Sequence, residues 1–249
     1  MKKLLFTLFI PFFAVQANGQ IAAKSIWAEY GFPNISKDSV AMYTMYGITR
    51  YRMYADDQYI RMETYQNLSE EQLKAYGPTM RSIMVKERAS NDVFLCISMD
   101  DLQIKMKGEE KERESFKQMM DRFNSENHNV YAKSGKTTDV LGYSCAEILI
   151  KGTNTDTVSC FVTTQIALDP SISDFPLYVS NQGVLQGLML GRNELAWNGQ
   201  TLEFRATQLK INEPLDLKAE LEKFNLVSNE KGNELLKAVF MKSLEQGKN

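Results

Sequence analysis

The sequence predicts an α+β fold in which a curved antiparallel sheet packs against a few helices. In the amino-terminal half, short segments alternate apolar and polar residues between turn signals, which is typical of half-buried strands. In the carboxy-terminal half, two predicted hairpins precede amphipathic helices. No repeat, low-complexity tract or linker divides the chain, so we expect a single domain over residues 20–249.

Strands are predicted first at 40–46, 49–55, 58–65, 81–87 and 92–98. In the segment 58–65, Ile60 and Met62 alternate with Arg61 and Glu63, so that apolar and charged side chains take opposite faces. A capping box at 69–72 begins a short helix that Gly77-Pro78 ends. The repeat of this strand pattern predicts an antiparallel sheet in this half.

A charged helix is predicted after Gly108, with one apolar stripe of Phe116, Met119, Met120 and Phe123. Two hairpins follow, at 143–151 with 157–165, and at 188–197 with 200–211 around Asn198-Gly199. The chain ends in two helices. Their apolar stripes are Leu217, Leu221 and Phe224 in the first and Leu235, Leu236, Val239, Phe240 and Leu244 in the second.

The amino terminus resembles a secretory signal peptide. Lys2 and Lys3 precede an apolar stretch over 4–15, and the small residues 17–19 follow. The apolar stretch is shorter than the roughly 20 residues that span a bilayer. We therefore expect residues 1–19 to be removed, and the mature chain to be periplasmic or secreted and not membrane-spanning.

Export makes a disulfide possible between Cys145 and Cys160, on the two arms of the first hairpin. If the hairpin is centred between Gly152 and Thr153, the two cysteines lie directly opposite each other, at a Cα separation of about 4.5–5.5 Å that a disulfide accepts. The alternative is two buried thiols that act as small apolar groups. Cys96 lies in an apolar strand and is expected to be a buried thiol.

Sites for catalysis and metals are not evident in the sequence. The single histidine, His128, has no framed nucleophile, and the three cysteines lack zinc-ligand spacing. The formal net charge is −2, with basic and acidic residues interspersed, so nucleic acid is not an expected partner. We predict a protein that is not an enzyme and has no cofactor. A carboxylate-dependent hydrolase stays open as an alternative, because the spacing of paired carboxylates is set in three dimensions.

A dense set of methionine and tyrosine residues is the candidate ligand site. Methionine adapts to irregular apolar shapes, and tyrosine joins an apolar body to a polar edge. The candidate residues are Met42, Met45, Tyr46, Met53, Met62 and Met84. The alternative is that these side chains fill the core between sheet and helices.

Four segments, taken in order, resemble exported and largely uncharacterised Bacteroidota families related to the GLPGLI proteins. They are Arg61-Met62-Glu63, the stretch 139–145 with Gly142-Tyr143-Ser144-Cys145, the strand 160–167 with Asp169-Pro170, and Gly187-Leu188-Met189-Leu190-Gly191, which lacks the proline of the naming motif. Their layout is distantly similar to the lipoprotein carriers LolA and LolB. The resemblance implies a half-open barrel that wraps helices and holds acyl chains.

The same resemblance implies glycosylation. Asp38-Ser39-Val40 and Asp156-Thr157-Val158 resemble the acceptor sequence of that phylum, with Ser39 and Thr157 as the modified residues. A glycan there would solubilise a loop without adding an activity.

The leading functional hypothesis is an exported, non-catalytic binding protein that carries an apolar ligand, such as a lipid or a lipoprotein acyl chain, in the periplasm. The alternative is a cell-envelope protein–protein interaction module, because the stripe of the last helix fits a partner as well as its own sheet.

Overall fold

The computed structural model describes residues 19–33, 48–66, 79–124, 130–151, 157–181, 185–195 and 201–246. Most of the predicted signal peptide, the predicted strand at 40–46 and the predicted helix after the capping box lie outside these residues. The helices are α3 (Glu110–Asn124), α4 (Leu217–Leu221) and α5 (Asn229–Gln246), with a single 3-10 turn η2 (Pro170–Ile172), in the part of the chain that is described. The strands are β1 (Ile21–Ala23), β2 (Ile26–Gly31), β3 (Ile48–Ala55), β4 (Tyr59–Gln66), β5 (Met80–Glu87), β6 (Val93–Met99), β7 (Leu102–Lys107), β8 (Val130–Val140), β9 (Tyr143–Lys151), β10 (Thr157–Thr163), β11 (Ile166–Leu168), β12 (Tyr178–Asn181), β13 (Leu185–Leu195), β14 (Thr201–Ile211) and β15 (Asn225–Val227).

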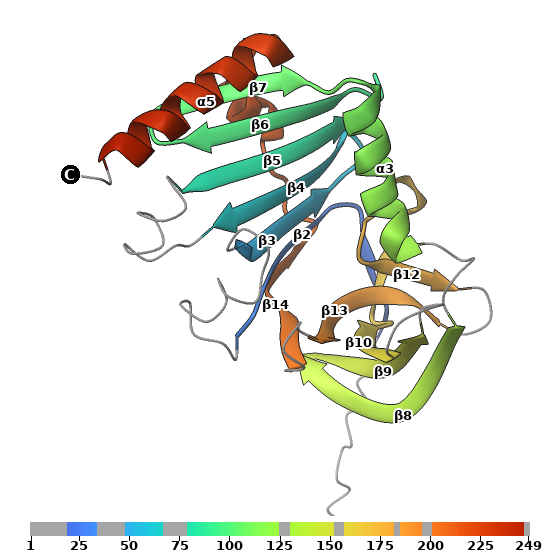
Figure 1. Cartoon of the computed structure of the whole chain (residues 1–249). Coiled ribbons are helices and arrows are strands. Elements are labelled where there is room, and N and C mark those ends of the chain that lie inside the picture. Colours follow the sequence, from blue (N-terminus) through green and yellow to red (C-terminus); the bar gives the residue numbers. More distant parts are fainter. Residues whose placement is uncertain are drawn as a thin grey trace, which may run out of the picture.

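One large sheet dominates the fold and confirms the predicted α+β class. Among the described residues it has thirteen strands, in the order β15-β7-β6-β5-β4-β3-β2-β14-β13-β10-β9-β8, with β12 paired to β13. Its strands are antiparallel to their neighbours, apart from the parallel pair β15 and β7. Figure 1 shows the sheet strongly curved and open, so that strands β2–β7 and strands β8, β9, β10 and β13 form two differently oriented halves. β1 and β11 form a separate two-stranded sheet.

The strands predicted from alternation are confirmed with small shifts at their ends, as β3–β6, β9, β10, β13 and β14. The strands that the sequence did not predict include β2, β7 and β8. Almost every residue of β2 is buried, so that its sequence does not alternate. β7 is short and follows its partner after a two-residue turn. β8 is an edge strand rich in Lys, Ser and Thr, so it lacks the apolar alternation by which half-buried strands are predicted.

The curved sheet has an inner and an outer face, because successive side chains of a strand point to opposite sides. The largest core cluster joins both halves of the sheet, for example Met53 of β3, Phe161 of β10 and Leu188 of β13, and therefore lies on the inner face. Phe116 of α3 belongs to this cluster. The register places Met106 of β7 on the same face, where it packs near α5.

Helix α4 covers the outer face. Leu221 at its end and Phe224 just beyond pack against Ile83 and Cys96, whose side chains point away from the inner core. Figure 1 shows α5 lying across β6 and β7, and α3 standing at the other end of these strands. The sheet is thus covered by different helices on its two faces.

Candidate functional site

The structure brings together the three predicted ligand-binding methionines that it describes. Met53 pairs with Met62, and Met62 pairs with Met84, across strands β3, β4 and β5. Direct cross-strand neighbours on one face have Cβ atoms about 4.5–5.5 Å apart, so the three side chains are adjacent. We call the full line of neighbours across β2–β7 the methionine row; it consists of Ala28, Met53, Met62, Met84, Leu95 and Met106.

The methionine row is largely buried. Met53 and Met62 belong to the main inner core cluster, and Met84 is half-buried and packs against it. Much of the row therefore contributes to the core, as the alternative interpretation of the sequence expects. The other predicted ligand residues, Met42, Met45 and Tyr46, lie outside the described residues.

A cleft of about 300 Å³ lies beside the methionine row, between α3 and the sheet. Its apolar lining is Ile60 and Val93 of the sheet together with Phe116 of α3. Ile60 is two residues from Met62 on the same strand, so the cleft continues the inner face next to the row. Its charged and polar lining is Lys86, Asn91, Glu110, Arg113, Glu114, Lys117 and Asp174.

Lys86 has a distinct position in this cleft. It lies directly between Ile60 and Val93 in the register of β4, β5 and β6, and its side chain is half-buried. Among the described residues, no carboxylate pairs with its ammonium group. By contrast, Asp174 on the rim accepts two hydrogen bonds from Arg88, at 2.7 and 3.0 Å. The cleft thus places the Lys86 ammonium group, which forms no ion pair among the described residues, beside an apolar floor of Ile60 and Val93. The charged side chains of α3 face the same space.

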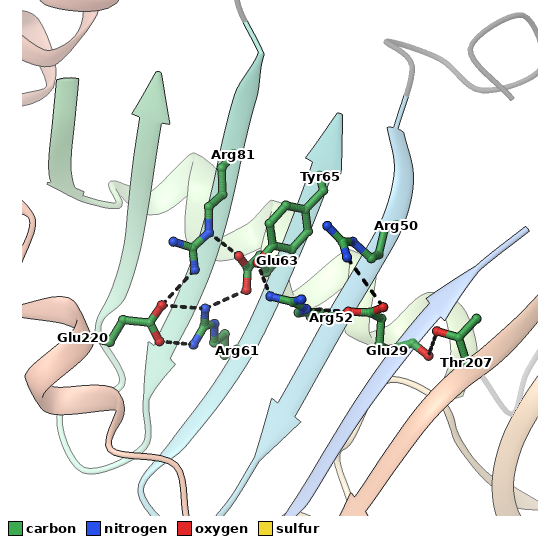
Figure 2. Close-up of polar contacts among 9 residues, drawn as sticks. All are labelled: Glu29, Arg50, Arg52, Arg61, Glu63, Tyr65, Arg81, Thr207 and Glu220. Carbon is green, nitrogen blue, oxygen red and sulfur yellow. Dashed lines mark hydrogen bonds and ion pairs between the residues drawn. The ribbon is translucent and has the colours of Figure 1, made fainter. Parts of the chain in front are cut away.

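The outer face of the same strands holds a network of buried charges, shown in Figure 2. Its centre is Glu63, only 1% exposed, which accepts hydrogen bonds from Arg61 at 2.6 Å and from Arg81. Glu220 of α4 accepts from the same two arginines, at 2.5 Å and 2.8 Å for its shortest contacts. The network therefore ties α4 to strands β4 and β5.

The acid–base properties of this network follow from its partners. Burial acts to raise the pKa of Glu220, but hydrogen bonds from Arg61 and Arg81 and their charges outweigh it, so the pKa lies below its ordinary value. Burial acts to lower the pKa of Arg81, and the hydrogen bond to Glu63 leads the opposing effects that raise it. Both groups are thus held in their charged forms.

A second part of the outer face surrounds Tyr65. Arg52 donates to the Tyr65 hydroxyl and, at 2.6 Å, to Glu29. Thr207 donates to the backbone carbonyl of Glu29 at 3.2 Å. Burial raises the pKa of Tyr65, and the neighbouring Glu63 raises it further. Alternation along 58–65 predicted that Arg61 and Glu63 share a face, but nothing in the sequence identified Glu29 or Glu220 as their ionic neighbours.

The predicted disulfide between Cys145 and Cys160 is wrong for this structure, where both cysteines are buried and free. Lys151 pairs with Thr157, so the hairpin is centred on position 154 and not between 152 and 153. Cys160 consequently lies opposite Ile148, while Cys145 lies opposite Thr138 of the next strand. Burial raises the pKa of Cys145 to about 11, as expected for an unreactive thiol.

Other predicted features are only partly described. His128 and Ser39 lie outside the described residues, and Thr157 begins β10. Among the described side chains, no group of three potential metal ligands occurs. The described helices include none with the length and apolar character that a membrane span requires.

No protein-family model and no curated protein matches the sequence. Solved structures with detectable similarity include PNGF-II, 14% identical over 83% of this chain and 31% of that chain, with a TM-score of 0.38. They also include an uncharacterized conserved protein from Thermus thermophilus, 9% identical over 83% of this chain and 91% of that chain, with a TM-score of 0.43. A third is the MucA/MucB complex of Pseudomonas aeruginosa, 10% identical over 78% of this chain and 54% of that chain, with a TM-score of 0.31.

This chain spans about a third of the length of PNGF-II. TM-scores this low do not establish a common fold with any of the three structures. The LolA-like detail of the predicted fold therefore stays a prediction.

Proposed function

We propose that the protein is an exported, non-catalytic binding protein that carries an apolar ligand with an anionic head, such as a fatty acid, in the periplasm. The observation that carries this proposal is Lys86, which rises between Ile60 and Val93 in the cleft beneath α3. A cation within an apolar floor suits a ligand that has one charged end and a hydrocarbon chain.

The size of the cleft and the apolar residues of its floor support this ligand class. Small-molecule sites have volumes of roughly 300–1,000 Å³. The described cleft, at about 300 Å³, is at the lower end of this range. The half-buried Met84 lies two residues from Lys86 on the same face, so that flexible methionine side chains are next to the proposed site of the head group.

Helix α3 is the element that would move to admit a longer chain. Among its described side chains, Phe116 is the only buried one, and the rest of that surface is charged or polar. A helix at the margin of a core, with most of its described side chains in water, can be displaced at a lower free-energy cost than a central strand. The resemblance to LolA and LolB, in which helices lie within a half-open barrel that holds acyl chains, favours the same arrangement.

The test is titration with a fluorescent fatty acid and with the fatty alcohol of equal chain length. Lys86→Gln is expected to weaken binding of the acid about tenfold and to leave binding of the alcohol unchanged, because the variant removes the counter-ion and keeps the apolar floor. The matched control is Lys237→Gln on α5, an exposed lysine away from the cleft. Equal affinity of wild type and Lys86→Gln for the acid would contradict the proposal.

Isolation from cells tests the native ligand. Native mass spectrometry of protein purified from periplasm, followed by lipid extraction, is expected to show excess mass that denaturation removes and acyl chains in the extract. A clean mass of the mature chain, together with no affinity for the fluorescent acid, would leave the methionine row as ordinary core.

A second function, an envelope interaction module, is favoured by the end of α5. Leu235 and Leu236 pack on the sheet, whereas Phe240 and Met241 are 41% and 49% exposed. The apolar surface of the helix therefore extends beyond its own sheet, where a partner could contact it. Truncation after Lys237 would separate the two roles. If the removed segment docks a partner, the shortened chain still folds; if the segment belongs to the core, the shortened chain loses its fold.

A further inference from the structure

The outer face of the sheet holds a group of arginines that the ionic network does not fully use. Arg50, Arg52 and Arg81 place their guanidinium carbons 4.5, 4.7 and 5.6 Å from the centre of the Tyr65 ring. We call the three arginines together with Tyr65 the arginine cluster. In the register of β3, β4 and β5, Tyr65 lies directly between Arg50 and Arg81. Figure 2 shows the three guanidinium groups gathered around this ring.

The charges of this region do not balance. Its four guanidinium groups, which belong to the arginine cluster and Arg61, face the three carboxylates of Glu29, Glu63 and Glu220. Glu63 and Glu220 are shared by Arg61 and Arg81. Glu29 is bound by Arg52 at 2.6 Å, so Arg50 is the remaining cation.

Among the described residues, Arg50 stacks near Tyr65 and donates no hydrogen bond. Its contact with Glu29 is 3.8 Å, which is longer than a hydrogen bond, and its side chain is 44% exposed. Its guanidinium carbon lies 4.5 Å from the centre of the Tyr65 ring, a cation–π contact that restricts the side chain. A guanidinium held in this way loses little conformational entropy when it binds an anion.

Arg50 and Arg52 are close enough to bind the same anion. Both contact the carboxylate of Glu29, Arg52 at 2.6 Å and Arg50 at 3.8 Å, and both lie within 5 Å of the Tyr65 ring centre. Planar guanidinium groups bind phosphate, sulfate and carboxylate through paired hydrogen bonds. The single carboxylate of Glu29 offsets only part of the charge of these two arginines, and a bound anion would offset the rest.

A cleft of about 340 Å³ adjoins the cluster at Arg52. Arg52 and Lys210 each lie 5.8 Å from the ring centre of Trp27, which is part of the cleft lining together with Gln208 and Glu213. The half-buried Trp27 offers an apolar surface, while the amide and carboxylate can hydrogen-bond hydroxyl groups. A ligand with an anionic group on the arginine cluster thus has space for a polar, ring-shaped body.

We propose that the outer face binds a small oxyanion-bearing ligand, with its phosphate, sulfate or carboxylate group on Arg50 and Arg52 and its body in the cleft beside Trp27. This site is on the opposite face of the sheet from the cleft beneath α3, and the proposal does not depend on the carrier function.

The test is isothermal titration at low ionic strength with inorganic phosphate, inorganic sulfate, glucose 6-phosphate and glucose. Phosphate and sulfate are expected to bind saturably, glucose 6-phosphate more tightly than either, and glucose not measurably. Arg50→Gln is expected to weaken each anion about tenfold or more, because one of the two charged partners is lost. Added sodium chloride should weaken binding as well, since the groups involved are exposed.

The variants separate this site from others. The one ion pair of Arg50 among the described residues is the 3.8 Å contact with Glu29, so the melting temperature of unliganded Arg50→Gln should stay within about 2 °C of wild type. The matched control is Lys237→Gln on α5, an exposed cation away from both clefts. Trp27→Leu should remove the preference for glucose 6-phosphate over phosphate. No saturable anion binding, or an equal loss in Lys237→Gln and Arg50→Gln, would overturn the proposal.

Discussion

Replacing Glu63 by Gln tests how strongly the buried network stabilises the fold. Glu63 is 1% exposed and accepts hydrogen bonds from both Arg61 and Arg81, so the variant leaves two guanidinium groups with one shared carboxylate, Glu220. Removing one partner of a buried ion pair costs about 3–5 kcal/mol. We expect the lower end, about 3 kcal/mol, because Glu220 remains and the Arg81 side chain is 32% exposed to water.

The measurement is urea-induced unfolding at neutral pH, with the slope checked so that only the midpoint changes. For a chain of this size, about 3 kcal/mol also lowers the melting temperature by about 6–12 °C. The matched control is Glu234→Gln, which removes an exposed ion pair with Lys231 on α5 and should cost less than about 0.5 kcal/mol. A loss below about 1 kcal/mol for Glu63→Gln would refute the reasoning, because it would mean that the charge of Glu63 is hardly needed.

Two further predictions concern the pH dependence of the network and the packing of the sheet. The pKa of Glu220 is lowered by its arginines, so its ionised form stabilises the fold above its ordinary pKa of 4.5, and this contribution is lost as the pH falls through the lower folded pKa. Glu220→Gln should therefore destabilise the protein by about 1–2 kcal/mol at pH 7 in urea unfolding, and its difference from wild type should shrink below pH 4.5. In Gly187→Ala, the new Cβ would lie 2.3 Å from the Thr163 carbonyl oxygen, and since that atom is backbone we expect a loss of about 3 kcal/mol or more. Gly191→Ala, where the nearest atoms are 3.2 Å away, should cost less in the same assay, and equal losses would contradict this explanation.

The sequence predicted the sheet from local alternation. In the segment 58–65 it placed Ile60 and Met62 on one face and Arg61 and Glu63 on the other, and the structure confirms this: Met62 joins the inner core, whereas Arg61 and Glu63 form an ion pair on the outer face. Such a prediction needs only the geometry of a strand, in which each side chain takes the face opposite to its neighbour. The structure also explains why position 187 is a glycine. The strand passes so near the Thr163 carbonyl that a side chain would have no room.

The parts that the sequence did not predict depend on contacts between distant segments. Glu220 is 157 positions after Glu63 in the chain, and only the packing of α4 on the outer face brings them to the same arginines. The disulfide prediction failed on a shift of less than two positions in the hairpin centre, which was enough to move Cys145 away from Cys160. No local pattern specifies such a shift when the loop is rich in turn residues.

The two faces of the sheet place different constraints on how a ligand could enter. Met62 lies on the inner face between Arg61 and Glu63, which are bound to the outer network, so a shift of β4 toward or away from a ligand would disturb buried ion pairs. The floor of the inner cleft is therefore stiff. Helix α3 has no ion pair to this network among its described residues, and Phe116 is the one buried side chain in its described part. Any enlargement of the cleft should consequently come from displacement of α3 over an unchanged sheet, and substitutions in the outer network should affect stability without changing the affinity for an acyl ligand.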